Sequence, residues 1–185
     1  LQLDQVAGAR IAGSGDLTIT DAVGTLTSDL SRVTVDGVVI AVGENAALDI
    51  SNAALSRQFT FDVSADGELT LAGSQVGGRS FTGEGTLIAE IDSNSSNVNL
   101  GSAAVASDLI LISHVTESVD FDGQFGDFSV EVVDAVMLST AATTVDGVAV
   151  TGDGNLELTG DSSASAVDLS QISNAGSATL EFVNN

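Results

Sequence analysis

The sequence predicts an all-β protein assembled from repeats, and three observations support that fold class. A motif of Val-x-Gly, an apolar residue and Gly-x-Gly-x-Leu occurs three times, beginning at Val6, Val76 and Val145. Segments between these motifs alternate apolar with polar or small residues, as half-buried strands do. The 185 residues include no proline, which suits strands whose backbone N–H groups must donate hydrogen bonds at almost every position.

The repeat unit is about 70 residues long. Its first motif recurs at steps of 70 and 69 residues, measured between the glycines Gly13, Gly83 and Gly152. A second marker keeps the same step in the segments "DLSRV", "NLGSA" and "DLSQI", which begin at Asp29, Asn99 and Asp168. A fixed period of this kind indicates an array or a solenoid. We therefore divide the chain into copies at residues 1–75 and 76–144 and an incomplete third copy at residues 145–185.

The strands of the first copy are expected to follow one another with turns between them. They comprise Asp16–Thr20, Thr34–Val42, Ala46–Ile50, Gln58–Val63 and Gly67–Gly73. The segments "VDG" at Val35 and Val145 and "ADG" at Ala65 are expected to be turns in which glycine supplies a positive φ. Helical spacing with capping signals is missing, and only Ser51–Ser56 is expected to make one helical turn.

Two architectures accommodate about seven short strands in each copy. A β-solenoid would wind each copy into roughly three coils stacked about 4.8 Å apart. Tandem β-sandwiches would make each copy one small Greek-key module. The seven Phe and the lack of Trp and Tyr favour the solenoid, because aliphatic side chains can fill a narrow interior, whereas the repeat length favours the sandwich. Both stay open, with the solenoid preferred.

The charge of the chain is strongly negative and unevenly distributed. The net charge is −22, and all basic residues lie in the first 79 positions, at Arg10, Arg32, Arg57 and Arg79. From Ser80 onward there are sixteen acidic residues and no Arg or Lys. Such a surface repels nucleic acid and anionic lipid, so neither is expected as a partner. No apolar run approaches the ~20 residues of a membrane helix, so membrane insertion is not expected.

The best candidate for ligand binding is the segment "VDFDGQFGDFSVE", from Val119 to Glu131. Its carboxylates are hard oxygen ligands of the type that calcium prefers, at Asp120, Asp122, Asp127 and Glu131. The spacing imitates an EF-hand loop at the first, third and twelfth positions, but Phe125 stands where that loop requires glycine. The alternative is a turn between two strands with its acids facing water.

Catalysis is not expected from this composition. His114 is the only histidine and has no evident partner for a metal site or a Ser-His-Asp relay. The Gly-x-Gly motifs precede strands and not helices, so they are expected to be tight turns and not phosphate loops. A solenoid enzyme acting on acidic polysaccharides would need basic groups, and the chain has four Arg and no Lys or Tyr. We expect a protein that is not an enzyme.

The segments "GSGDLTIT", "GDGNLELTG", "DLSRVTVDG" and "AVDLSQISNAG" resemble the repeats of large secreted bacterial surface proteins, which include adhesins and cell-surface fibres. The resemblance covers the whole chain and implies a secreted or cell-surface structural protein. Calcium-binding nonapeptide arrays of such proteins read Gly-Gly-x-Gly-x-Asp, and this chain lacks their tandem continuation. The resemblance transfers no functional residues.

The two ends of the chain suggest a mode of assembly. Leu1–Gly8 resembles the end of a preceding unit, and we expect it to form a strand; the third copy lacks the strands that finish the first two. An unfinished β-unit leaves an unpaired edge. We therefore expect head-to-tail self-association by β-strand addition into a surface fibre. The alternative is an adhesin stalk or binding module, stabilised by calcium, that recognises a glycan or a surface.

Overall fold

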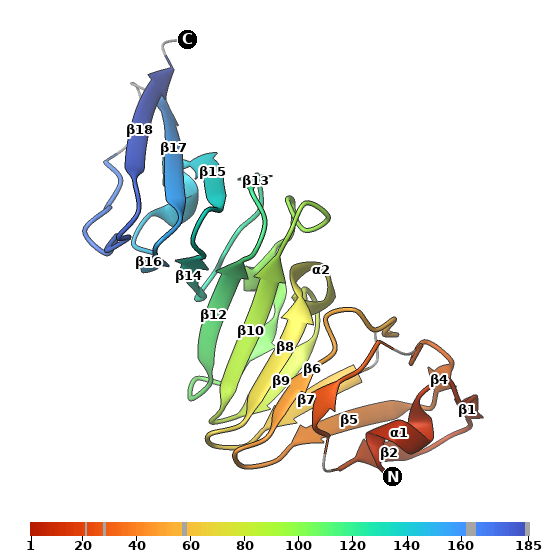
Figure 1. The fold of residues 1–185 in the computed structure, drawn as a ribbon. Helices are drawn as coiled ribbons and strands as arrows, with labels where there is room; N and C mark the ends of the chain where they lie inside the picture. The colour runs from red at the N-terminus through yellow and green to blue at the C-terminus, as the bar shows by residue number, and fades with distance from the viewer. Residues whose placement is uncertain (21, 28, 57–58, 162–165, 184–185) are drawn as a thin grey trace. The chain divides into compact units, whose positions relative to one another are not determined.

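The structure is a computed structural model that describes residues 1–20, 22–27, 29–56, 59–161 and 166–183. It is almost entirely β, with parallel sheets wound as a β-solenoid of about eight turns (Figure 1). The prediction of an all-β repeat protein is confirmed, and the solenoid is the correct one of the two architectures, because a Greek-key sandwich requires antiparallel strands. The chain forms two compact units: residues 1–88 with 102–110, and residues 89–101 with 111–185.

The first unit contains three sets of parallel strands. The largest is ordered β11-β9-β7-β5-β2 and comprises β2 (Asp16–Ile19), β5 (Gly37–Val42), β7 (Phe59–Val63), β9 (Ser80–Gly83) and β11 (Ala104–Val105). The second contains β3 (Gly24–Thr25), β6 (Ala47–Asp49) and β8 (Glu68–Ala72), and the third pairs β1 (Ile11–Ala12) with β4 (Val33–Thr34). The predicted strand Gln58–Val63 is observed from Phe59, and Gln58 lies outside the described residues.

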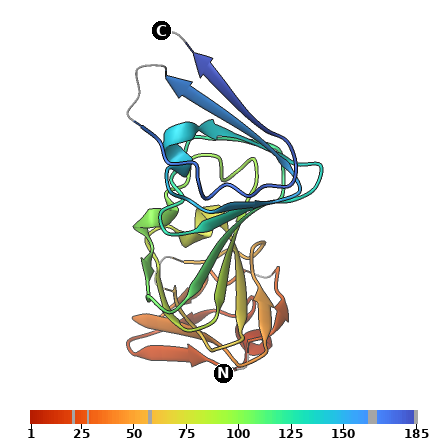
Figure 2. The ribbon, with the colours of Figure 1, turned by 90° about the vertical axis from the view of Figure 1, so that its left-hand side faces the viewer.

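The second unit has two sets of parallel strands. One pairs β12 (Ile110–Val115), β14 (Ser129–Val132) and β16 (Val150–Gly152). The other is ordered β13-β15-β17-β18 and comprises β13 (Val119–Phe121), β15 (Met137–Ala141), β17 (Asn155–Asp161) and β18 (Ala178–Val183). In Figure 2, β17 and β18 lie side by side near the C-terminus. The first residue of β12 belongs to the first unit, and β10 (Thr86–Ile91) has residues in both.

The core is formed by buried side chains at equivalent positions of successive turns, which stack on one another. In the first unit Ile19 is in register with Ile40, Ile40 with Phe61 and Phe61 with Phe81, and all four are at most 1% exposed. The rings of Phe61 and Phe81 are stacked, with centroids 5.4 Å apart and planes at 11°. Because each residue covers the one before it, a narrow interior without Trp or Tyr is filled by aliphatic and Phe side chains.

One short helix recurs with the period of the sequence repeat. The three occurrences are α1 (Leu3–Val6), α2 (Gly73–Val76) and the 3-10 turn η2 (Ala142–Val145), whose first residues are 70 and 69 positions apart. Each ends on a valine, Val6, Val76 or Val145, that is fully buried. A further 3-10 turn, η1, spans Leu100–Ser102. The repeated helix therefore forms a corner of the coil, and its last residue, a valine, packs in the interior.

The Gly-x-Gly motif is a turn that lies directly on the turn before it. A Cβ on Gly83 would lie 1.9 Å from the carbonyl oxygen of Val63, and one on Gly152 would lie 2.1 Å from that of Val132. Both glycines also have positive φ, 107° and 104°. The prediction of a tight turn is confirmed, and the reason for glycine is both its φ and the close approach of two backbones.

Three local predictions were wrong. In the "ADG" turn the positive φ belongs to Asp66 (57°) and not to Gly67. Glycine is required at position 67 because a Cβ there would lie 2.8 Å from two carbonyl oxygens, those of Gly43 and Ser64. In the first "VDG" segment, Gly37 is extended within β5, whereas Gly147 does have positive φ (69°). The expected helical turn in Ser51–Ser56 is a simple turn.

The expected N-terminal strand is also wrong, apart from its first residue. Leu3–Val6 is helical, because the third residue of this turn, Gln5, accepts a hydrogen bond from the backbone of Gln2. Leu1 alone pairs with β2: its nitrogen donates to Thr18 O at 3.2 Å, and its carbonyl accepts from Thr20 N at 3.0 Å. Leu1 is thus paired with β2 through one residue, and after Gln2 the helix begins at Leu3.

Candidate functional site

The four carboxylates of the predicted calcium site are exposed and distributed over different parts of a turn. Asp120 lies on β13, and Glu131 lies on β14, which belongs to a different set of strands. Asp122 and Asp127 lie in the segment that joins these two strands. The buried residues of this segment are Gly123, Phe125 and Phe128, and its other residues are exposed.

The structure does not gather these carboxylates into a ligand set. Among the residues that the structure describes, there is no group of three or more His, Cys, Asp or Glu side chains placed to hold a metal ion. The backbone of the segment is occupied by stacking, since Asp122 N donates to Ser96 O and Gln124 N to Val98 O. The observed arrangement is a stacked connecting segment whose acids point outward.

His114 lies on β12, half-buried, with Glu131 as its neighbour in the next strand and Thr151 in the strand after that. Such a ladder places an imidazole beside one carboxylate on the surface of the sheet. No serine is in register with His114 in these two pairings, so they do not form the relay of a serine hydrolase.

The Gly-x-Gly turns are unsuited to phosphate because they face carbonyl oxygens. Gly85 approaches the carbonyls of Ser64 and Gly67, and Gly154 approaches those of Val133 and Val136. Phosphate binding requires backbone N–H groups aimed at the ligand, usually at the start of a helix. A strand follows each of these turns, β10 after Gly85 and β17 after Gly154.

The second sequence marker is a hydrogen-bonded turn built on aspartate. Asp29 accepts from Ser31 N at 2.8 Å, and Asp168 accepts from Ser170 N at 2.9 Å. These bonds favour the ionised form, so the hydroxyl and backbone of Ser31 lower the pKa of Asp29, and those of Ser170 lower the pKa of Asp168. At Asp92, burial raises the pKa, but bonds from Ser95 and Asn94 outweigh it and the pKa is lowered. These aspartates have a structural role in their turns.

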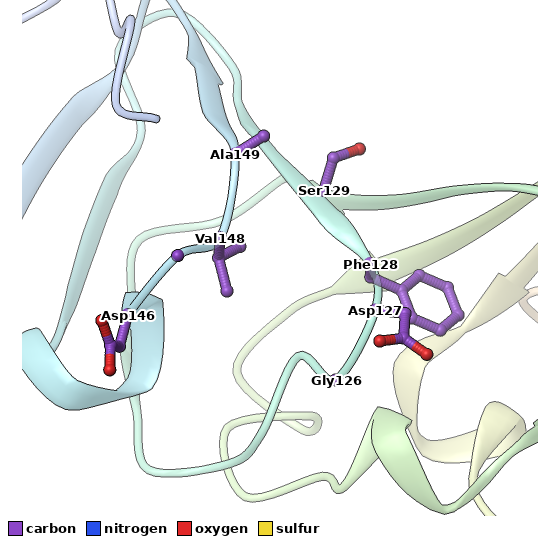
Figure 3. Close-up of a pocket in the computed structure, with 8 residues that line it drawn as sticks. Gly126, Asp127, Phe128, Ser129, Asp146, Val148 and Ala149 are labelled. Carbon is purple, nitrogen blue, oxygen red and sulfur yellow. The ribbon is translucent and has the colours of Figure 1, made fainter. Parts of the chain in front are cut away.

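A pocket of about 460 Å³ opens between two successive turns of the second unit. Residues 126–129 line it from one turn and residues 146–149 from the next. Figure 3 shows Asp127 and Asp146 on its two sides, with Val148 between them. Asp146 is exposed, and one of its oxygens accepts from Asp168 N at 2.7 Å. This pocket was not predictable from a local pattern, because the residues that form it are 20 positions apart in the chain.

Two polar side chains that join turns of the first unit, the half-buried Gln75 and the buried Arg79, were not predicted from the sequence. Gln75 donates to Ile50 O at 3.2 Å and to Ala53 O at 2.6 Å. Arg79 is 8% exposed and donates to Gln75 O and, at 2.6 Å, to Ser56 O. The recurrence of glutamine at Gln5 and Gln75, one repeat apart, is the signal that identifies the first of these positions.

Comparison with protein-family models, with curated proteins and with solved structures finds no match to this chain. Within the described residues, no helix has the length and apolar character needed to cross a bilayer.

Proposed function

We propose that this chain is a structural protein of the cell surface, without catalytic activity, that forms a fibre by adding one molecule's turns to the end of another's. The observation that carries the proposal is the exposed edge of β18. This strand pairs with β17 through residues 178–183, and no second partner of β18 is found among the described residues. A parallel stack with such an edge presents its backbone groups to a further strand.

The side chains of β18 support the same proposal. Leu180 continues an inward ladder that runs through Phe121, Thr140 and Leu158. The earlier members of this ladder are at most 3% exposed, whereas Leu180 is 43% exposed. Covering this leucine with another apolar residue would remove apolar surface from water, which stabilises a contact.

The acceptor at the other end is the edge of β2. Among the described strands, β2 pairs with β5 alone, and Leu1 covers the other side of β2 only at Ile19. Because Leu1 occupies the carbonyl of Thr18 and the N–H of Thr20, Asp16 and Leu17 offer the open part of that edge. Since the segment Leu3–Val6 is helical, the strand that is added is β18 and not the N-terminus. The contact is heterologous and grows filaments if it does not close into a ring.

Two variants of adjacent residues test the proposal. Leu180→Lys places a charge in the inward ladder at the edge and should block addition. Thr179→Lys introduces the same charge on the opposite face of the strand, next to Glu157 in register, and should assemble normally. Sedimentation velocity and negative-stain microscopy at equal concentration measure the outcome. Fibres of Leu180→Lys that match those of Thr179→Lys, or an unsubstituted chain that stays monomeric, would refute assembly through β18.

A further inference from the structure

The pocket of the second unit has a counterpart in the first unit, and there it is filled. Ala9, Arg79 and Val148 hold the same place in the repeat: each donates its backbone N–H to the carbonyl of the valine that ends the helical turn, at Val6, Val76 and Val145 respectively. Each also follows a glycine with a φ of 69–73°. The backbone at the three positions is therefore the same, and the side chain is what differs.

In the second copy this place belongs to the buried Arg79. Its guanidinium group extends between two turns and donates to the carbonyl of Ser56, 23 residues earlier, and its Nε donates to the carbonyl of Gln75. In the third copy Val148 is too short to make such contacts. The space between the turns at this position is the pocket, with Val148 at its centre (Figure 3).

The walls of this pocket carry negative charge that the nearby sequence does not neutralise. Asp127 lies on one side and Asp146 on the other, and both are exposed. The chain has no Arg or Lys after Arg79. A planar guanidinium offers five N–H donors, which suits a space bordered by two carboxylates. A metal ion fits less well, since the described residues provide no group of three metal-ligating side chains.

We infer that this pocket binds the guanidinium group of an arginine side chain from another polypeptide, in the position that Arg79 fills from within its own copy. The inference does not depend on the proposed fibre, because a single molecule carries the complete pocket. The exposed Arg10 and Arg32 of a second copy are one source of such a side chain, and a different protein is the other.

The test is a ¹H–¹⁵N NMR titration of the full chain with N-acetyl-arginine amide, with N-acetyl-lysine amide as the second probe. We expect saturable shifts confined to residues 126–129 and 146–149, and at least tenfold weaker binding of the lysine probe. Val148→Arg should fill the pocket from within and abolish binding. Asp127→Asn combined with Asp146→Asn should weaken binding at least tenfold, whereas the matched control Asp153→Asn, an exposed aspartate beyond the pocket, should not.

Shifts spread over the acidic surface, equal binding of the two probes, or unchanged binding by the double asparagine variant would overturn the inference. The double variant alters only exposed side chains, so it keeps the test valid if Val148→Arg does not fold. A chain that carries both Arg10→Gln and Arg32→Gln separates the two sources: its self-association falls if a second copy supplies the arginine and is unchanged if another protein does.

Discussion

The α-carbon of Gly83 lies so close to Val63 that a Cβ at position 83 would be 1.9 Å from the valine's carbonyl oxygen. The third copy repeats this relationship between Gly152 and Val132, at 2.1 Å. In the first copy, by contrast, a Cβ on Gly13 would meet nothing within 4 Å, although its φ is also positive at 147°. The repeated spacing of Gly83 and Gly152 therefore reflects the stacking of one turn on another.

This difference predicts unequal effects of the same substitution. Gly83→Ala must both strain the backbone and separate two turns, and should lower the free energy of unfolding by about 3 kcal/mol. Gly13→Ala strains the backbone alone and should lower it by about 1 kcal/mol. Urea unfolding followed by circular dichroism measures both. Equal losses for the two variants would show that turn stacking does not require glycine.

The turn at Ala135 offers a stabilising substitution. The turns at Asn45, Asp66 and Ala135 share a positive φ of 54–64° and are each closed by a hydrogen bond across the turn. Alanine is the least suited of the three to this conformation, because its side chain cannot bond to the local backbone. We expect Ala135→Gly to raise the free energy of unfolding by about 0.5–1 kcal/mol.

The matched control is Ala65→Gly, one position before Asp66 in the equivalent turn. Ala65 is not among the described residues with positive φ, so glycine there only increases the freedom of the unfolded chain and should destabilise by about 0.5–1 kcal/mol. The same sign of change for Ala135→Gly and Ala65→Gly would contradict this account of the turn.

The side chain of Gln75 should contribute more to the free energy of unfolding than that of its counterpart Gln5. Both side chains accept a hydrogen bond from the backbone of the residue three positions earlier, but Gln75 also donates to two carbonyls of another turn, those of Ile50 and Ala53. Gln75→Ala removes the donor to Ala53 O and one of the two donors to Ile50 O, and it should lower the free energy of unfolding by about 2–3 kcal/mol. Gln5→Ala, at an exposed position, should cost about 0.5–1 kcal/mol. Thermal unfolding of the two variants measures the difference; a larger loss at Gln5 would refute it.

The fold class was predictable because the relevant signals are local. Alternation of apolar and polar residues and the spacing of Gly83 and Gly152 are visible in the sequence alone. The choice between solenoid and sandwich was not decided by alternation, since side chains alternate in the same way in parallel and antiparallel strands. That choice depends on pairings such as Val38 with Phe59, which no local pattern reveals.

The helical turns and the pocket were not predictable for a related reason. Four-residue helices such as Gly73–Val76 carry no periodicity, and this one is held by bonds from Gln75 to another turn. The predicted calcium ligands Asp120 and Glu131 are close in sequence, but the chain changes from one set of strands to another between them. Proximity in sequence is therefore a poor guide to proximity in space within a solenoid turn.

The pH dependence of stability should identify the turn at Asp29. Hydrogen bonds from Ser31 lower the pKa of this carboxyl below its ordinary value of 3.8. A lowered pKa in the folded state contributes stability that is present above pH 3.8 and is lost as the pH falls through the folded pKa. Asp29→Ala should thus be less stable than the unsubstituted chain at pH 7, and the difference should shrink below pH 3.8. Protonation of the other carboxylates at low pH affects the variant and the unsubstituted chain alike, so it cancels in the difference between their free energies of unfolding. A difference that widens toward pH 2, in urea unfolding at each pH, would contradict the assignment.

Calcium should have no specific effect on the stability of this chain. Calcium and magnesium both screen the net charge of −22, so both should raise the melting temperature by similar small amounts. A saturable rise in melting temperature with calcium alone that disappears in Asp120→Asn combined with Asp122→Asn would contradict this expectation and support the predicted metal site. Differential scanning calorimetry in matched chloride salts is the appropriate measurement.

X-ray diffraction from aligned fibres of the unsubstituted chain tests the central claim, end-to-end stacking of parallel turns, most directly. If β18 of one molecule continues onto β2 of the next, the strand spacing of about 4.8 Å must lie along the fibre axis. A sharp meridional reflection at about 4.8 Å is the predicted result. A reflection at that spacing on the equator, or material that forms no fibres at all, would contradict it.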